Sequence, residues 1–184
     1  MPGSIGFYGS IVDGTTTKYG FFTAAHVVLS NSTVKIDWFT SVGKTIKWQL
    51  ANNGEADVAF VEMTGYGHSF SNKVEGIQLR SNVFVIPALN STVYFVGNHA
   101  KNVPGTVEDN NMDSYIHFQI TGQYYHLFSL INVSGLGCVG GDSGGLLYTK
   151  SGNTASVCGI LTGGTGSSDD FTKASKIPWG AKVL

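Results

Sequence analysis

A serine set between small residues and next to a carboxylate is the feature of this sequence with the clearest capacity for chemistry. It lies in Gly141-Asp142-Ser143-Gly144-Gly145. Glycines carry no Cβ, so they let the backbone adopt positive φ and approach a ligand closely. The backbone N–H groups of Gly141 and Ser143 could point into one small space, where they would stabilise a developing oxyanion. Because a serine hydroxyl alone is a weak nucleophile, this chemistry requires a base elsewhere in the chain.

Two upstream motifs supply a candidate base and a group to orient it. His26 lies in Thr23-Ala24-Ala25-His26-Val27, and Asp57 lies in Ala56-Asp57-Val58-Ala59-Phe60. A histidine can take the serine proton and return it to a leaving group, while a carboxylate holds the imidazole in the required tautomer. Each motif alone is ordinary in a β-rich protein, where the histidine would be structural, the aspartate would enter a strand and the glycines would form a turn. Together they predict a catalytic triad of His26, Asp57 and Ser143.

In this order and with these surroundings, the motifs resemble those of the chymotrypsin-like serine peptidases, and the resemblance extends approximately over residues 3–175. It implies an all-β fold of two six-stranded antiparallel β-barrels with the active site in the cleft between them. It also implies a serine endopeptidase that acts on a peptide or polyprotein substrate through a covalent acyl-enzyme. Residues 23–27 are similar to viral polyprotein-processing proteases, whereas Gly97 and Gly105-Thr106-Val107 are similar to small bacterial members, so a viral and a secreted bacterial enzyme both stay open.

The acidic residue before the serine has a further role in the family that the chain resembles. There it is buried and paired, and it holds the oxyanion hole open, so Asp142 is expected to have a partner. Arg80, which is the single arginine of the sequence, and Lys101 are the candidates. For both of them a solvated position on the surface is the alternative.

The expected specificity pocket involves residues 159–164, which resemble the strand that pairs with substrate backbone. Four of these residues are expected to bind substrate: Leu161, Thr162, Gly163 and Gly164. They predict an apolar pocket for a medium or large neutral side chain, with the threonine behind Asp57. Asp169 and Asp170 follow this wall. If Asp170 reached the pocket floor, its charge would favour basic side chains, and an exposed loop is the alternative for the pair.

Short runs of β-branched and aromatic residues recur between turn signals, and a spacing of about 8–12 residues is typical of an all-β sandwich or barrel. They predict strands over residues 5–12, 19–23, 33–39, 45–50, 58–63, 83–86, 92–96, 115–120, 127–133, 145–148 and 156–162. Asp13-Gly14 and Ser151-Gly152-Asn153 are candidate hairpin turns, and residues 24–29 could form one helical turn. A glycine-rich seam at residues 65–76 divides the predicted barrels into residues 1–72 and residues 73–184.

Composition argues against several other function classes. The net charge of −1 gives no basic field for nucleic acid, and no apolar stretch approaches the roughly 20 residues that span a bilayer. Cys138 and Cys158 are too few for a disulfide scaffold or a structural metal site. A disulfide between them and two free thiols both stay open, and the thiols are favoured.

We expect no cofactor, metal, nucleic acid or membrane partner. No signal peptide is visible in residues 1–4, and location and oligomeric state are not determined.

Two rival functions arise from the same residues. The motif around Ser143 also fits the G-x-S-x-G elbow of an α/β-hydrolase, but that fold places its histidine after the serine. No histidine follows Ser143 in this chain, so that class is excluded. The remaining alternative is a catalytically silent binding module on the same two barrels. All three triad residues are present, which favours the enzyme.

Overall fold

β-Strands make up most of the chain, as the recurring β-branched and aromatic runs predict. The computed structural model describes residues 2–36, 40–64, 69–119 and 121–184. In chain order the strands are β1 (Phe7–Asp13), β2 (Thr16–Thr23), β3 (Thr33–Ile36), β4 (Thr40–Leu50), β5 (Asp57–Met63), β6 (Lys73–Val74), β7 (Ile77–Phe84), β8 (Thr92–Val96), β9 (Val103–Phe118), β10 (Gln123–Ser134), β11 (Leu146–Ser151), β12 (Thr154–Gly164), β13 (Ser168–Lys173) and β14 (Lys182–Val183). Two short 3-10 helices, η1 (Ala25–Val27) and η2 (Ala174–Lys176), are the helical segments of these residues.

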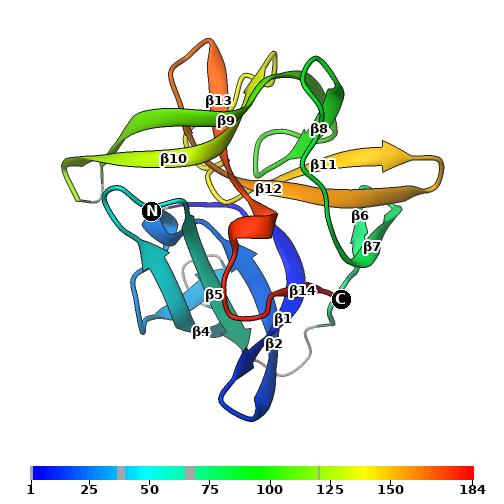
Figure 1. Ribbon diagram of the computed structural model, residues 1–184. Coiled ribbons are helices and arrows are strands. Elements are labelled where there is room, and N and C mark those ends of the chain that lie inside the picture. The colour runs from blue at the N-terminus through cyan, green and yellow to red at the C-terminus, as the bar shows by residue number, and fades with distance from the viewer. Residues whose placement is uncertain (1, 37–39, 65–68, 120) are drawn as a thin grey trace.

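The first sheet collects the N-terminal strands and lies in the lower half of Figure 1. Its six strands are antiparallel and follow the order β14-β1-β2-β5-β4-β3. The predicted turn at Asp13-Gly14 joins β1 to β2, because Asp13 pairs with Thr16 and Gly14 adopts a φ of 61°. Strand β14 returns from the second half of the chain to pair with β1, so the C-terminal residues complete the first sheet.

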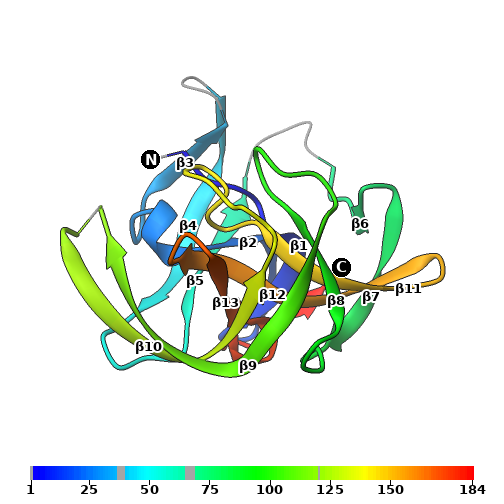
Figure 2. The same cartoon turned by 90° about the horizontal axis from the view of Figure 1, so that it is seen from above.

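The second sheet contains the remaining strands in the order β11-β8-β9-β10-β13-β12-β7-β6. An additional pairing between β11 and β12 closes six of these strands into an antiparallel barrel, to which β7 adds in parallel beside β12. The predicted turn at Ser151-Gly152-Asn153 joins β11 to β12. The long hairpin of β9 and β10 extends from this barrel beside the first sheet (Figure 2). The predicted all-β fold of two six-stranded antiparallel barrels is therefore confirmed.

Apolar clusters fix the two sheets relative to each other and so define the space between them. One cluster packs Phe7, Phe22 and Phe60 of the first sheet against Tyr148 and Ile160 of the second. Burying one large apolar side chain contributes about 1.5–3 kcal/mol to stability, so a cluster of this size holds the two sheets against each other. A separate cluster packs the β9–β10 hairpin against η1, β4 and β5. The hairpin is thereby held beside the turn that carries the candidate histidine.

Strand limits differ from the sequence prediction where polar residues interrupt the apolar runs. Strand β8 agrees with the predicted residues 92–96, whereas β9 begins at Val103, well before the predicted start at Tyr115. Strand β13 is absent from the sequence prediction because Asp169 and Asp170 suggest a loop. The ends of two predicted strands, at residues 37–39 and 120, and residues 65–68 of the predicted seam lie outside the described residues.

Candidate active site

His26 is presented by the short helix η1, which follows directly after β2. The helix ends after a single turn, where the Val28 N–H donates to the Ala25 carbonyl. The Trp48 indole N–H, from the neighbouring strand β4, donates to the carbonyls of Ala25 at 2.8 Å and Val28 at 3.0 Å. This side chain, which sequence analysis did not single out, ties both ends of the turn to the sheet. The predicted helical turn behind the histidine is confirmed.

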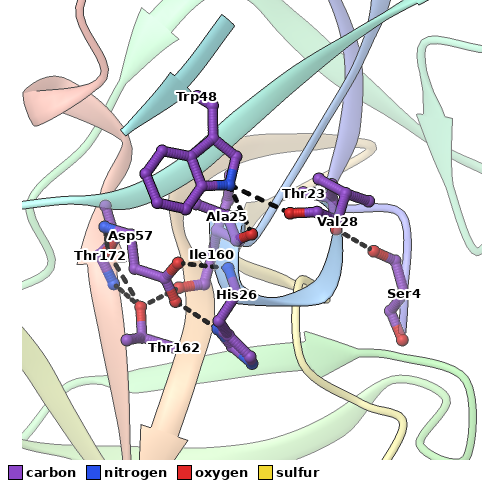
Figure 3. A network of polar contacts seen from close by, with 10 residues as sticks. All are labelled: Ser4, Thr23, Ala25, His26, Val28, Trp48, Asp57, Ile160, Thr162 and Thr172. Carbon is purple, nitrogen blue, oxygen red and sulfur yellow. Dashed lines mark hydrogen bonds and ion pairs between the residues drawn. The ribbon is translucent and has the colours of Figure 1, made fainter. Parts of the chain in front are cut away.

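Asp57, the first residue of β5, is completely buried and bonds to His26 twice (Figure 3). Its Oδ2 lies 2.6 Å from the His26 Nδ1, and its Oδ1 accepts from the His26 backbone N–H at 3.0 Å. A carboxylate only accepts hydrogen bonds, so Nδ1 carries the proton and the neutral imidazole keeps a lone pair on Nε2. The structure thus joins two of the three predicted triad residues in the geometry that leaves Nε2 free to act as a base.

Two threonine hydroxyls from the second barrel stand behind Asp57. The Thr172 hydroxyl accepts from the Asp57 backbone N–H at 2.9 Å, and it lies 2.9 Å from the Thr162 hydroxyl. Sequence analysis expected Thr162 behind Asp57; the structure places it one step further back, with Thr172 in direct contact (Figure 3). Both threonines are buried. The position of the aspartate therefore depends on β12 and β13, although its own strand belongs to the first sheet.

The imidazole face of His26 packs on Phe118, at the end of β9. The two ring centroids are 4.7 Å apart with an interplanar angle of 24°. His26 itself is only 7% exposed, and Phe118 is buried. Because the ring is stacked on one side and bonded through Nδ1 at its edge, its orientation is fixed before any ligand binds. No local sequence signal identifies this contact, since Phe118 is far from the motif in the chain.

The loop that carries Ser143 depends on glycines at two positions. Gly141 adopts a φ of +101° and Gly144 a φ of +88°, both in the region that residues with a side chain rarely occupy. A Cβ at Gly144 would also lie 2.3 Å from the Thr23 hydroxyl and 2.5 Å from the Ser4 carbonyl oxygen. The Gly144 N–H donates to the Leu161 carbonyl at 2.9 Å, which anchors the loop to β12. The glycines that drew attention in the sequence are thus required by backbone conformation and by close contact.

Asp142 is buried and accepts two backbone hydrogen bonds. Its Oδ1 accepts from the His99 N–H at 2.7 Å, and its Oδ2 accepts from the Val139 N–H at 3.1 Å. The His99 Nδ1 also lies 3.6 Å from Oδ1. The family resemblance correctly predicts a buried, paired aspartate, but neither suggested cation is its partner. Arg80 and Lys101 are both exposed, which agrees with the alternative of a solvated position on the surface.

Ser4 uses all its polar groups in hydrogen bonds, and two of these bonds join the N-terminal segment to the Ser143 loop. Its N–H donates to the Ser143 carbonyl at 2.7 Å, and its hydroxyl donates to the Gly141 carbonyl at 2.9 Å. The same hydroxyl accepts from the Asn98 N–H at 2.8 Å. Its carbonyl accepts from the Thr23 hydroxyl at 2.8 Å (Figure 3). Sequence analysis missed this residue because a serine near the chain start carries no motif.

One cleft of about 380 Å³ brings the first-sheet and second-sheet residues together. His26 and Ser143 both line it, with Gly141 and Thr162 beside them. Neither the Gly141 N–H nor the Ser143 N–H donates a hydrogen bond to another of the described residues. The opposite wall comes from residues 114–119 of β9 and the turn after it, and from Tyr124. A serine hydroxyl, an imidazole and two unused backbone N–H donors therefore face one cleft.

A second cavity of about 210 Å³ also opens at Ser143. Its walls include three of the four residues expected to bind substrate, Leu161, Gly163 and Gly164, and the fourth lines the cleft. Among the two aspartates, Asp169 lines this cavity and Asp170 does not. Both are buried in β13 rather than exposed in a loop. The Asp170 Oδ1 instead accepts from the Asn132 side-chain amide at 2.7 Å.

The two cysteines are free thiols. Burial raises the pKa of Cys138, and the Asp169 charge raises it further. Burial likewise raises the pKa of Cys158 to about 12. Thiols of this kind stay protonated at neutral pH and are poor nucleophiles, so neither competes with Ser143 for the chemistry of the cleft.

In the described part of the chain, no three His, Cys, Asp or Glu side chains group in a way that could hold a metal ion. No helix of those residues is long and apolar enough to cross a membrane.

Comparison with solved structures identifies the fold. The chain superposes on a glutamic acid-specific serine protease with a TM-score of 0.73 at 19% identity, covering 99% of this chain and 98% of that one. Nocardiopsis protease gives a TM-score of 0.74 at 21% identity, covering 97% and 90%. The murine norovirus NS6 protease gives 0.50 at 16% identity, covering 92% and 94%. No family model matches the sequence, and no curated protein matches it. The chain therefore has the fold of the chymotrypsin-like serine proteases.

Proposed function

We propose that the protein is a serine endopeptidase that uses His26, Asp57 and Ser143 as its catalytic triad. The observation that carries this proposal is the buried His26–Asp57 pair, with 2.6 Å between Nδ1 and Oδ2, on the cleft that Ser143 also lines. The pair leaves the imidazole Nε2 as an acceptor, which is the form a general base requires. The protease fold adds support, and a peptide or a polyprotein is the substrate class it favours.

The reaction follows from the roles of these groups. His26 Nε2 takes the Ser143 hydroxyl proton while Oγ attacks the scissile carbonyl carbon, and Asp57 stabilises the imidazolium that results. The carbonyl oxygen becomes an oxyanion that accepts hydrogen bonds from the Gly141 and Ser143 N–H groups. Each such donor contributes about 3–4 kcal/mol in related reactions. The tetrahedral intermediate then breaks its C–N bond, and His26 donates its proton to the departing amine.

Hydrolysis of the acyl-enzyme repeats the same steps with water. His26 removes a proton from the water molecule, the hydroxide attacks the ester carbon, and the Ser143 oxygen leaves with the proton that His26 returns. The elements of one water molecule are thereby added across the peptide bond, and the enzyme is regenerated. No metal or cofactor is needed in any step. Asp142 contributes by holding the Val139 and His99 N–H groups, which keeps the loop in the conformation that exposes its donors.

The decisive experiment is covalent labelling combined with turnover. A peptidyl phosphonate should modify the wild-type protein on Ser143 alone, as peptide mapping by mass spectrometry would reveal. Ser143→Ala should remove both labelling and cleavage of a mixed peptide library, with circular dichroism unchanged. Ser91→Ala, which replaces a serine outside the cleft and the cavity, is the matched control and should leave both intact. A protein that binds peptides but is neither labelled nor able to cleave them would be the silent binding module instead.

A further inference from the structure

A carboxylate without a cationic partner lies in the wall of the cavity that opens at Ser143. The side chain belongs to Asp169, which is 9% exposed and lines this cavity. Within the described residues, it takes part in none of the ion pairs. Its one hydrogen bond there is long, from the Cys138 N–H to Oδ2 at 3.5 Å. A buried charge of this kind is costly to the free protein unless something pairs with it.

The Asp169 carboxylate lies between two walls of the cavity. On one side Asp169 pairs directly with Gly164 across β12 and β13. A Cβ at Gly164 would lie 2.8 Å from the Asp169 Oδ1, so the glycine leaves room for this oxygen at the wall. On the other side the Cys138 N–H approaches Oδ2, and Cys138 belongs to the segment that leads into the Ser143 loop. A side chain that entered from Ser143 would therefore meet Asp169 between these walls.

The surrounding charges favour a cation in this position. Burial raises the pKa of Asp169, and the neighbouring carboxylates of Asp170 and Asp142 raise it further. Both effects disfavour an isolated negative charge, and a cation placed beside it would relieve both. Within the described part of the chain, the rest of the lining is small or apolar and carries no other charged side chain: Gly137, Cys138, Val139, Gly140, Ser143, Leu161, Gly163, Gly164, Gly166 and Ser167.

We propose that this cavity binds a lysine or arginine side chain, from the residue on the acyl side of the cleaved bond, and that Asp169 selects it. The proposal rests on the endopeptidase function proposed above. Small walls admit the long aliphatic stem, Leu161 packs against it, and the carboxylate pairs with the ammonium or guanidinium group. Arginine could engage both carboxylate oxygens. This proposal differs from the sequence-based expectation of a neutral side chain. It follows the alternative of a basic side chain, with Asp169 in the place that the sequence analysis considered for Asp170.

The same geometry argues against an acidic side chain. The glutamic acid-specific protease of similar fold uses a histidine triad in substrate binding. Among the residues that the structure describes, no histidine lines this cavity, and the one carboxylate in its lining is that of Asp169. A glutamate side chain would meet a like charge at Asp169, so related folds are expected to select opposite charges in this place.

The test compares peptide substrates that differ only in the residue before the cleaved bond: lysine, arginine, leucine, phenylalanine or glutamate. The wild type should cleave the lysine and arginine substrates with kcat/KM at least about tenfold above the others. Asp169→Asn should lower kcat/KM for the two basic substrates by about 100-fold, since one member of a buried pair is lost. Its kcat/KM for leucine should stay within about threefold, because no pairing is removed there.

Two further variants separate this proposal from its rivals. Glu75→Gln removes one negative charge from the exposed turn between β6 and β7 and should keep the basic preference. Asp170→Asn tests the neighbouring carboxylate, and a loss of basic preference in this variant alone would assign the selection to Asp170. A wild type that prefers neutral or acidic substrates, or an Asp169→Asn protein with the wild-type profile, would overturn the proposal.

A binding measurement tests whether the cavity binds a cation even if no peptide is cleaved. Benzamidine, a small planar cation, should raise the Tm of the wild type and of Glu75→Gln but not that of Asp169→Asn. If Asp169→Asn does not fold, the wild-type substrate profile and a competition between benzamidine and its neutral analogue benzamide decide instead. Failure of phosphonate labelling at Ser143 would refute the endopeptidase function alone. Successful labelling without any basic preference or benzamidine effect would refute the pocket alone.

Discussion

The two halves of the proposed active site are held in place by different kinds of interaction. Around His26, side chains fix the imidazole: Asp57 bonds to its ring and to the His26 backbone N–H, and Phe118 of β9 stacks on its face. On the other side, the Ser143 loop is fixed through its backbone, by positive φ at Gly144 and by the hydrogen bonds of Ser4. The proposed base thus has its tautomer selected by one carboxylate, whereas the proposed nucleophile has its position selected by several backbone constraints.

This difference predicts how substitutions in each half should affect the reaction rate and the stability. Loss of the carboxylate should change protonation without moving atoms, so it should affect rate far more than stability. Loss of a backbone constraint should move the loop, so it should affect rate and stability together.

The largest effect is expected on the first-sheet side. Asp57→Asn should lower kcat by about 10⁴-fold, because the amide stabilises the wrong imidazole tautomer. The fold should persist, since the amide has nearly the same shape. Kinetics and circular dichroism on the same preparation would check this. Asp13→Asn, in the exposed ion pair with Lys47, is the control and should keep full activity. A rate loss below tenfold would mean that the carboxylate does not hold the base.

Gly144→Ala should damage both rate and stability. The new Cβ would lie 2.3 Å from the Thr23 hydroxyl at a φ of +88°, so the loop must shift. We expect a loss of about 2–4 kcal/mol in unfolding free energy together with a fall in kcat. Gly152→Ala is the matched control, since Gly152 also has positive φ but no atom within 4 Å of the added Cβ. It should cost only about 1–2 kcal/mol and leave kcat unchanged. Equal behaviour of the two variants would contradict the role of the contact.

Ser4→Ala should produce a smaller effect of the same mixed kind. It leaves the Gly141 carbonyl and the Asn98 N–H without their hydroxyl partner, which costs about 1–3 kcal/mol. Phosphonate labelling of Ser143 should slow because the loop loses a tether, while KM should change little. Ser91→Ala, which removes an exposed hydroxyl bonded to a nearby carbonyl, should alter neither quantity. Unchanged labelling in Ser4→Ala would leave Ser4 with a purely structural role.

The smallest effect concerns stability against pH. Burial raises the pKa of Asp169, so the folded state binds its proton more tightly than the unfolded state does. The contribution of this group to wild-type stability therefore decreases as pH rises through its folded-state pKa. Asp169→Asn cannot titrate and should have the higher Tm at neutral pH. That advantage should disappear on acidification below the pKa of the unfolded chain. Thermal melts of both proteins across pH would check this, and a lower Tm for the variant at neutral pH would contradict it.

Much of the candidate site could be predicted from the sequence alone, because its residues lie in short local motifs. His26, Asp57 and Ser143 each lie in a recognisable short context, and the glycines around the serine indicate a backbone with special conformation. The runs of β-branched and aromatic residues likewise predicted most strands. The local sequences Asp13-Gly14 and Ser151-Gly152-Asn153 predicted two tight turns. Such features depend on residues that are neighbours in the chain, so no knowledge of the fold is needed to see them.

The tertiary structure decided every feature that depends on residues distant in the chain. His99 rather than Arg80 approaches Asp142, and Phe118 packs on His26, because the barrels bring β9 and the loop after β8 to the cleft. Asp169 rather than Asp170 lines the cavity at Ser143, because side chains alternate along β13 and only one of two neighbours can face inward. A sequence shows that two carboxylates are adjacent. Which of them lines the cavity is set by how β13 pairs within the folded sheet.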